Sequence, residues 1–352
     1  MDRSLVACIL AGGVGTRLYP ATRPDRPKQF LAFGGDGSLL SDTTDRVDFV
    51  DETYVLTREA FADDVSAHAP EAAVLCEPAP KDTGPALVYA AHRIREQVGE
   101  CVVLVLPSDH RVTGPVEQTL RRGARVALET EGLITFGVEP TRPATGYGYV
   151  EPDGGDTDRQ QAGDGYQPVY HFLEKPDEDT ARGLIERGCY WNAGIFAWTP
   201  SALLREARRS PLSPLVEELE AGNPDEGFRA VEAVSVDRAI MEQTDLAYVV
   251  PAAFEWADLG SWDAIGREFD VGDEDGIATP SDEDGNVILG EGLTIDATGC
   301  VLAGDAHVSV VGVDDLVVAA YDDRVLVIPR EDAERVREVV TALREEGLFC
   351  SD

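Results

Sequence analysis

The chain has 352 residues, of which 66 are acidic and 30 basic, and its formal net charge is -36 at pH 7. Charge of this sign and size repels nucleic acid and anionic membranes, so we expect neither as a partner. The length suffices for one large domain and a smaller one, with ample material for a buried core.

The acidic side chains are spread through segments with hydrophobic periodicity and are not gathered in one tail. At molar salt the Debye length falls to about 3 Å and screens most of their repulsion, so the composition indicates adaptation to a salt-rich cytoplasm. The first apolar run, Leu5–Leu10, is too short to span a bilayer, and no charged segment with a cleavage site accompanies it. We therefore expect a cytoplasmic protein.

The cysteine pattern favours free thiols over disulfides or a zinc site. No two cysteines have C-x-x-C spacing, and several lie in apolar runs, which is typical of buried thiols. The six are Cys8, Cys76, Cys101, Cys189, Cys300 and Cys350.

Apolar runs alternate with helical spacing through the first 200 residues. Buried parallel strands are expected over residues 5–10, 53–57, 73–76 and 102–106. Helices are expected over residues 84–97 and 115–129. Further strands are expected over residues 132–138, 168–173 and 194–198, with a polar loop over 151–167. This βαβ order predicts a doubly wound α/β sheet.

The sequence pattern changes after about residue 266. Short β segments broken by Gly and Asp run from Asn286 to Ile328, which predicts either a few turns of β-helix or a small sheet. The chain then ends in an expected amphipathic helix, Asp332–Glu346. Its apolar face would consist of Val336, Val339, Val340 and Leu343.

Only three of the 30 basic residues are lysines, and each lies in a short motif rich in Gly or Pro. Because the rest of the chain uses arginine, we interpret Lys28, Lys81 and Lys175 as candidates for contact with phosphate, which suits a compact ammonium. The alternative, a residual surface lysine, applies mainly to Lys81.

A glycine-rich loop directly follows the first expected strand. Gly12, Gly13 and Gly15 let backbone N–H groups approach a phosphate, and Arg17 presents a planar fork to phosphate oxygens. The loop is neither a Walker A motif nor G-x-G-x-x-G. A glycine loop alone is weak evidence, but followed by Pro-Lys-Gln-Phe at residues 27–30 it is a specific signal.

Further motifs follow in a fixed order. They are Gly84–Ala86, Leu106–His110, Thr145–Tyr149, Phe172–Pro176, Trp191–Phe196, Ser235–Met241 and Trp256–Trp262. Together with Leu10–Leu18 and Arg26–Leu31, they make the chain resemble the sugar-nucleotidyltransferase family over roughly residues 4–330. The resemblance is strongest to the mannose-1-phosphate guanylyltransferases.

The resemblance implies an α/β fold with a doubly wound, mixed sheet of the Rossmann-like nucleotidyltransferase type. Residues 1–266 would form the catalytic domain, and residues 267–352 a small β-rich domain that ends in a helix. We expect the β-rich domain to serve oligomer contacts in a homodimer or other homo-oligomer, or to cover an edge of the active site.

The resemblance also assigns a nucleotide site. The residues that would contact GTP are Leu10, Ala11, Gly12, Gly13, Gly15, Thr16, Asp82, Thr83, Pro107 and Ser108. Arg17 and Lys28 would stabilise the leaving pyrophosphate. Family members usually carry Asn where this chain has Asp82, but a carboxylate is compatible with guanine because it accepts hydrogen bonds from N1–H and the 2-amino group.

For the metal, the resemblance implies that Asp109 and Asp258 together hold Mg²⁺, or another divalent cation such as Mn²⁺. Such an ion takes one or two carboxylates plus phosphate oxygens. Asp109 follows an expected strand, at the edge where open α/β sheets bind ligands. A cap or turn is the alternative for Asp109, and a structural hydrogen bond for Asp258. For His110, packing is at least as probable a role as chemistry.

For the sugar, the resemblance implies that Gly146, Tyr147, Glu174 and Asn192 bind mannose-1-phosphate. Lys175 would orient its phosphate. Asp237 is left open between substrate contact and a capping or salt-bridge role.

The implied reaction joins GTP and mannose-1-phosphate to give GDP-mannose and pyrophosphate, by in-line attack on the α-phosphate. One alternative is a glucose-1-phosphate thymidylyl- or uridylyltransferase, which shares the loop and the aspartates. The other is a silent regulatory paralogue that binds sugar nucleotide. A silent paralogue is expected to lose Arg17, Lys28 or a metal aspartate, and this chain has all of them.

Overall fold

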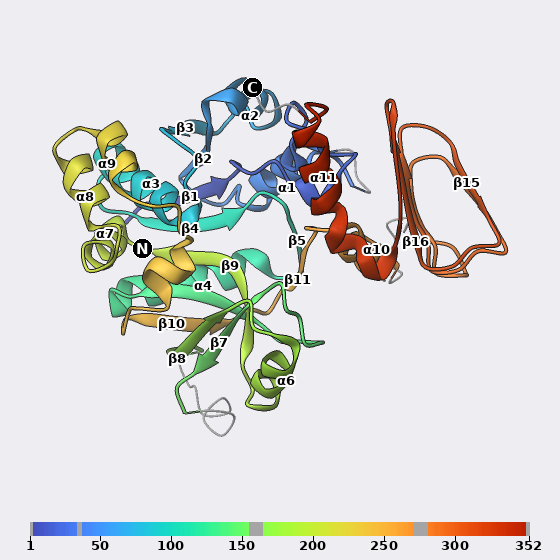
Figure 1. Cartoon of the computed structure of the whole chain (residues 1–352). Coiled ribbons are helices and arrows are strands. Elements are labelled where there is room, and N and C mark those ends of the chain that lie inside the picture. Colours follow the sequence, from blue (N-terminus) through green and yellow to red (C-terminus); the bar gives the residue numbers. More distant parts are fainter. Residues whose placement is uncertain (1–2, 34–36, 155–164, 271–280, 350–352) are drawn as a thin grey trace. The chain divides into compact units, whose positions relative to one another are not determined.

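The computed structural model of the chain describes residues 3–33, 37–154, 165–270 and 281–349 (Figure 1). The chain divides into two compact units. The first unit comprises residues 1–12, 43–107 and 112–256. The second unit comprises residues 13–42, 108–111 and 257–352.

The first unit is built on a nine-stranded mixed sheet within the described residues. In spatial order its strands are β3 (Ala73–Glu77), β2 (Glu52–Arg58), β1 (Leu5–Leu10), β4 (Val102–Pro107), β9 (Tyr190–Trp198), β6 (Leu133–Val138), β10 (Ala247–Pro251), β8 (Gln167–Glu174) and β7 (Gly148–Pro152). β1 is parallel to β2 and β4, whereas β9 is antiparallel to β4 and β6. The predicted doubly wound mixed sheet is confirmed.

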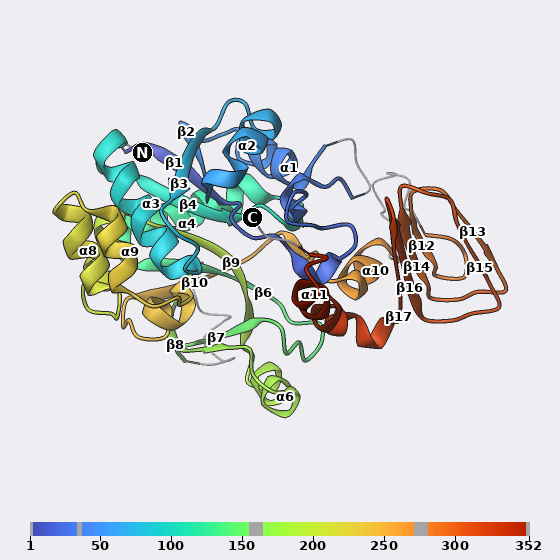
Figure 2. The same cartoon turned by 45° about the horizontal axis from the view of Figure 1, so that its top comes forward.

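The central strands read as continuous apolar runs because both of their faces are covered. Five of the six residues of β1 and of β4 are buried. The helices of this unit are α2 (Ala62–His68), α3 (Thr83–Val98), α4 (Val116–Thr130), α6 (Glu178–Glu186), α7 (Pro200–Ala207), α8 (Ser213–Glu220) and α9 (Pro224–Ala230), with the 3₁₀ turn η3 (Glu59–Phe61) and the π-helical turn η4 (Asp237–Met241). Figure 2 shows α3, α8 and α9 side by side, and residues from all three share one core.

Three further elements lie where the chain passes from one unit to the other. They are α1 (Leu39–Arg46), β5 (His110–Thr113) and β11 (Glu255–Asp258). β5 and β11 pair in a two-stranded sheet of their own.

The expected strands agree with the observed ones to within two residues, except for β9. This strand begins at Tyr190, four residues before the expected start at Gly194. The sequence hid the extension because Asn192 interrupts the apolar run. In the structure Asn192 is buried, and its amide oxygen accepts hydrogen bonds inside the sheet while its amide nitrogen donates to Asp237 in η4. Of the expected loop at 151–167, residues 155–164 lie outside the described part.

The second unit contains a short β-helix. One sheet consists of β12 (Val287–Leu289), β14 (Val301–Gly304), β16 (Leu316–Tyr321) and β17 (Arg324–Pro329), and the other of β13 (Gly292–Ile295) and β15 (Val308–Val311). β12, β14 and β16 are parallel, as are β13 and β15, while β17 closes the first sheet as an antiparallel hairpin with β16. Figure 2 shows these strands as stacked turns of one coil, so of the two predicted arrangements the β-helix is confirmed.

The other elements of this unit are two 3₁₀ turns, η1 (Thr16–Leu18) and η2 (Lys28–Phe30), then α10 (Trp262–Asp270), the 3₁₀ helix η5 (Arg330–Arg335) and α11 (Val336–Glu345). The expected C-terminal helix is thus α-helical only from Val336. In a 3₁₀ helix, side chains three residues apart lie on the same face. Ala333 and Val336 are three residues apart, and both pack into one core with Leu18 and Trp262.

The expected boundary between residues 266 and 267 falls inside α10. The two compact units partition the chain differently, since the second adds residues 13–42 and 108–111 to the C-terminal region. A domain division at residue 266 stays a prediction.

Two smaller expectations concern thiols and membranes. The five cysteines of the described residues are free thiols, four of them buried, as predicted. Among the helices in the described ranges, none is both long and apolar enough to cross a bilayer.

Candidate active site

The glycine loop leaves β1 at Leu10 and ends in the turn η1. The Ala11 carbonyl accepts a hydrogen bond from the buried Thr57 hydroxyl at 2.9 Å, which ties the start of the loop to β2. Gly15 has a φ of 76°, in the left-handed region that favours glycine. A Cβ at Gly15 would lie 2.6 Å from the Cβ of Lys28. The loop therefore needs glycine at residue 15 both for its backbone angle and for the space that Lys28 occupies.

Lys28 is almost completely buried, with 3% of its side chain exposed. Its Nζ lies 3.0 Å from Oδ2 of Asp109 and 3.6 Å from Oδ1 of Asp258. These two carboxylates are far apart in the sequence, yet both face one cation. Nε2 of His110 lies 3.8 Å from an oxygen of each. We call Arg17, Lys28, Asp109, His110 and Asp258 the Lys28 cluster, and all five belong to the second unit.

The Asp109 carboxyl has an altered acidity. Burial acts to raise the pKa of the Asp109 carboxyl, but the Lys28 ammonium and His110 outweigh it and lower that pKa to about 2. Asp109 is therefore negative at neutral pH. Ser108 before it is buried, and Pro107 ends β4, so the carboxylate stands directly at the carboxyl end of a central strand.

The Lys28 cluster fits a divalent cation that a substrate completes. Among the residues that the structure describes, no group of three or more His, Cys, Asp or Glu side chains could hold a metal ion. A Mg²⁺ site in a phosphate-transferring enzyme needs only one or two carboxylates, because substrate phosphates supply further ligands. Asp109 and Asp258 meet that requirement, since both already face the cationic Nζ of Lys28.

Arg17 forms an ion pair and lies beside a glycine. Its Nη1 lies 3.1 Å from Oε1 of Glu334 in η5. A Cβ on Gly260 would lie 2.7 Å from Nη2 of Arg17 and 2.9 Å from both carboxylate oxygens of Asp258. The guanidinium and the Asp258 carboxylate therefore both border Gly260, which leaves room for them because it has no side chain.

Of the predicted sugar residues, Glu174 and Asn192 belong to a second group, within the first unit. Asn192 Oδ1 accepts hydrogen bonds from the Thr135 hydroxyl at 2.8 Å and from the Gly194 N–H at 3.1 Å. Its Nδ2 donates to Oδ1 of Asp237 at 3.0 Å. The orientation of the Asn192 amide is thus fixed by residues from β6, β9 and η4. We call Thr135, Glu174, Lys175, Asn192 and Asp237 the Asn192 cluster.

Glu174 and Lys175 end β8 and pair with each other through Oε1 and Nζ. Lys175 has a φ of 50°, and its N–H donates to the Tyr147 carbonyl at 3.2 Å, so the Gly146–Tyr147 turn positions it. Its side chain is 58% exposed, whereas that of Glu174 is 10% exposed. The lysine is therefore accessible to a ligand, and Glu174 is held at the sheet.

Asp237 has an altered acidity. Burial, followed by the nearby charge of Glu174, raises the pKa of its carboxyl to about 7. Lys175 and the Asn192 amide oppose this shift without cancelling it. A carboxyl with a raised pKa therefore lies beside a fixed amide, where both offer polar atoms to a ligand.

The segment expected to contact the base makes structural hydrogen bonds. Asp82 is exposed, and its Oδ1 accepts from the Thr83 N–H at 2.7 Å as the cap of α3. The Thr83 hydroxyl accepts from the Val236 N–H at 3.0 Å. Lys81 donates from Nζ to the Val231 carbonyl at 2.6 Å, which is a structural contact.

Glu77, at the end of β3, lies closer to the glycine loop. A Cβ on Gly12 would be 3.2 Å from its Oε1. Burial raises the pKa of the Glu77 carboxyl to about 7, against the lowering effect of Arg58, and Asp82 raises it slightly further. A half-buried carboxylate therefore borders the loop backbone, at a sheet edge where α/β proteins bind ligands.

Comparison with known proteins connects these clusters to a family. The nucleotidyl transferase family matches residues 6–271, and the MannoseP isomerase/GMP-like beta-helix domain matches residues 290–343. The chain belongs to the nucleotidyl transferase family. It is therefore a nucleotidyltransferase enzyme, and the resemblance read from the motifs is confirmed.

Individual relatives of this nucleotidyltransferase cover nearly its whole length. It is 34% identical to a mannose-1-phosphate guanylyltransferase of Sinorhizobium fredii, over 96% of this chain and 68% of that protein. It is 33% identical to the xanthan biosynthesis protein XanB of Xanthomonas campestris, over 96% of this chain and 73% of that protein. A solved structure from Thermus thermophilus, described as a mannose-1-phosphate geranyltransferase, has 33% identity and a TM-score of 0.85, covering 97% and 99% of the two chains.

Sequence patterns did not single out Glu77 or Glu334 of the nucleotidyltransferase, and they left the role of Asp237 open. Glu77 ends an expected strand, and the rule that ligands bind at the carboxyl ends of strands could have found it. Asp237 lay in a recognised motif, but only the fold shows its contact with Asn192. Glu334 carried no signal, because its partner Arg17 is more than 300 residues away in the chain.

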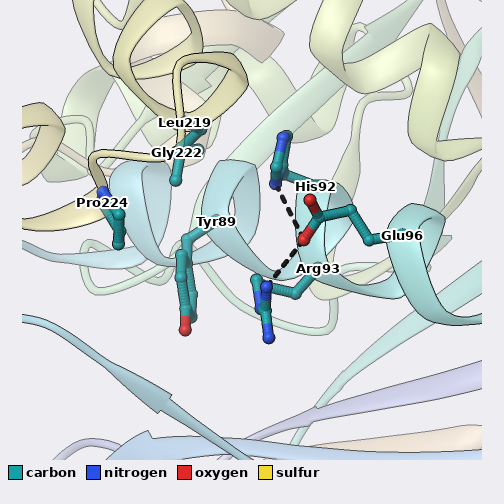
Figure 3. Close-up of a pocket in the computed structure, with 7 residues that line it drawn as sticks. All are labelled: Tyr89, His92, Arg93, Glu96, Leu219, Gly222 and Pro224. Carbon is teal, nitrogen blue, oxygen red and sulfur yellow. Dashed lines mark hydrogen bonds and ion pairs between the residues drawn. The ribbon is translucent and has the colours of Figure 1, made fainter.

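A separate cavity of about 310 Å³ opens on the first unit between α3 and the α8–α9 turn (Figure 3). Oε2 of Glu96 lies 2.7 Å from Arg93 and 3.7 Å from His92, and Tyr89 stands beside them. Burial lowers the pKa of His92, so this histidine is neutral at pH 7. None of the lining residues is a predicted site residue.

The loop geometry predicts contrasting effects for two neighbouring glycines. Gly15→Ala should lower the free energy of unfolding by at least about 2 kcal/mol, because a left-handed alanine and the contact with Lys28 both cost energy. Gly13→Ala should change it by less than about 0.5 kcal/mol, since a Cβ there meets no atom within 4 Å. Urea unfolding of both variants in high salt measures the difference. Equal losses would contradict the loop geometry.

The acidity of Asp237 predicts a pH-dependent stability. Its carboxyl pKa is about 7 in the folded chain against a reference of 3.8, so the folded state retains a proton that the unfolded state has released. That contribution to stability is complete below about pH 4 and is lost as the pH rises through about 7. Asp237→Asn has no such proton and should gain stability relative to the wild type between pH 5 and pH 8.

Unfolding curves at pH 5 and pH 8 measure this gain. Asp177→Asn is the control, because the Thr180 backbone N–H lowers the pKa of the Asp177 carboxyl, which is therefore ionised in both states and adds no pH dependence between pH 5 and pH 8. A parallel pH response of wild type and Asp237→Asn would show that the proton is not held at Asp237.

Proposed function

We propose that this nucleotidyltransferase joins GTP and mannose-1-phosphate to form GDP-mannose and pyrophosphate. The proposal rests first on the Lys28 cluster, where a buried ammonium and two carboxylates gather at the end of β4. That combination of one fixed cation and a two-carboxylate metal site suits a polyphosphate substrate. The name of the Sinorhizobium fredii relative supports guanine and mannose as the two specificities.

The reaction requires little covalent help from the protein. An anionic oxygen of the sugar phosphate attacks the α-phosphorus of GTP and forms a new P–O bond. The bond from that phosphorus to the oxygen bridging to the β-phosphate breaks, and its electron pair leaves with pyrophosphate. Because the nucleophile is already ionised near neutral pH, no general base is needed, and catalysis consists of positioning and charge stabilisation.

Each cluster would supply one part of that stabilisation. Lys175 has an exposed side chain and a backbone N–H that is hydrogen-bonded to Tyr147, and it would orient the phosphate of the sugar. Arg17 and Lys28 would stabilise the charge that accumulates on the leaving pyrophosphate. Glu174 would accept hydrogen bonds from sugar hydroxyls. Asn192 would donate one to a sugar hydroxyl through the second hydrogen on its Nδ2.

Asp109 and Asp258 would hold the divalent cation, Mg²⁺ or Mn²⁺. When bound, such an ion neutralises phosphate charge and makes the α-phosphorus more electrophilic. The low pKa of the Asp109 carboxyl, about 2, keeps it available as an ionised ligand at neutral pH. Lys28 would meanwhile keep the two carboxylates from repelling each other.

Glu77 supports guanine as the base. Guanine presents two adjacent donors, N1–H and the 2-amino group, and a carboxylate offers two acceptors in one plane. Of the acidic groups near the loop, Glu77 is half-buried and borders Gly12, whereas Asp82 is exposed and caps α3. Binding of those donors would stabilise the ionised form of Glu77 and oppose the effect of burial on its pKa.

Pyrophosphate release tests the proposed function. Mannose-1-phosphate and glucose-1-phosphate are each offered with GTP, UTP, dTTP and ATP, in molar KCl with Mg²⁺. We expect release with mannose-1-phosphate and GTP, and at least about a thousandfold loss of kcat in Asp109→Asn and Asp258→Asn, because each removes charge from the metal site. Preference for another pair would overturn the specificity, and no release by folded protein would overturn the activity.

A second prediction concerns Glu77. Glu77→Gln keeps one acceptor but turns a donor toward the donors of guanine, so the ratio of kcat/KM for GTP over ATP should fall about 10- to 100-fold. Glu71→Gln, an exposed carboxylate just before the same strand, should leave the ratio unchanged. An unchanged ratio in Glu77→Gln would remove Glu77 from base recognition.

A further inference from the structure

Arg17, placed above at the leaving pyrophosphate, is hydrogen-bonded to the C-terminal region of the same unit. Its Nη1 donates to Oε1 of Glu334 at 3.1 Å, and the other carboxylate oxygen of Glu334 lies 3.5 Å from Nη2 of Arg337. Glu334 belongs to the 3₁₀ helix η5, which leads into α11. One acidic side chain therefore connects the end of the β-helix region to a candidate catalytic arginine.

Both ends of this contact are anchored. Leu18, next to Arg17, is completely buried, and so is Val336, two residues after Glu334. Ala333, next to Glu334, is buried as well, and all three belong to the same hydrophobic core. Neighbours locked in one core leave the two backbones little freedom to separate, so the ion pair is set by packing and not only by charge.

Further contacts tie the same segment to the hairpin β16–β17. Arg23 Nη2 donates to the Tyr321 carbonyl at 3.0 Å, and Arg26 Nη1 lies 3.4 Å from Oδ2 of Asp322. The indole N–H of Trp262 donates to the Tyr19 carbonyl at 3.0 Å. Residues 13–31 thus rest on the C-terminal region at several points, and Glu334 is the one that reaches the candidate catalytic side chain.

We propose that Glu334 is a positioning residue for Arg17, holding one edge of the guanidinium so that the rest of its fork meets the leaving pyrophosphate. The inference rests on the proposed function. An arginine side chain has many rotamers, and the Asp258 carboxylate, which borders Gly260 as Nη2 of Arg17 does, is an alternative partner. Without Glu334, Arg17 would turn toward the metal-binding carboxylate, where it cannot serve the leaving group.

Loss of the Glu334 carboxylate should affect the reaction rate more than the free energy of unfolding. Glu334 is 59% exposed, and an ion pair at such a surface adds little to folding. The orientation of a catalytic group is more demanding, since a displacement of about 1 Å can cost a large factor in rate. We therefore expect a kinetic phenotype without a stability phenotype.

The first test compares Glu334→Ala with Glu338→Ala by pyrophosphate release from GTP and mannose-1-phosphate. Glu338 is a matched control, because it is also exposed and accepts from Nε of Arg335 at the same distance of 3.1 Å, outside the site. We expect kcat to fall about tenfold in Glu334→Ala, with KM for mannose-1-phosphate unchanged, and no change in Glu338→Ala. Glu334→Gln, which keeps an acceptor oxygen, should recover most of the rate.

A double-mutant cycle with Arg17→Ala separates positioning from a general structural effect. If Glu334 acts through Arg17, Glu334→Ala should cause no further loss in the Arg17→Ala background. Additive losses, an unchanged kcat in the single variant, or a lower KM for GTP that reveals Glu334 as a competitor of the phosphates would each overturn the proposal. If the wild type itself releases no pyrophosphate, the proposed function fails first, so the two failures are distinguishable.

Discussion

The burial of the Lys28 ammonium between Asp109 and Asp258 is the contact on which the rest of the candidate site depends. It brings together three parts of the chain, which are residues 13–31, the residues just after β4, and the end of β11. A buried cation without partners is strongly unfavourable, so the two carboxylates offset the cost of burying Lys28. The same contact fixes two carboxylates at one point. Gly15 leaves the space that this packing needs.

Much of the fold was predictable because it depends on local pattern. The strands β1 and β4 are unbroken apolar runs bounded by polar residues, and a sheet covered on both faces requires such runs. The same reasoning failed at β9, where Asn192 looks like the end of a strand. Its burial is tolerated because Thr135 and Asp237, both far away in the sequence, supply hydrogen bonds to it, together with the nearby Gly194.

The candidate site was predictable where its residues are rare and was hidden where they are common. Lys28 and Lys175 stand out in a chain with three lysines, and the glycine loop has a distinctive spacing. Glu77, Asp237 and Glu334 are three of 66 acidic residues, so composition gives them no contrast. Their interest comes from contacts across the fold, with Gly12, Asn192 and Arg17 respectively. Such contacts follow from topology and packing, which single-sequence patterns do not encode.

The geometry around Lys28 also means that the two basic residue types are not interchangeable in this protein. Arginine is longer and has a planar head with five donors, and its burial at residue 28 would displace Asp109 or Asp258. The Lys28 side chain is already packed against Gly15 along its first carbons, which leaves no slack for a wider group. Arginine occupies nearly all of the other basic positions of the chain, but it does not fit at residue 28.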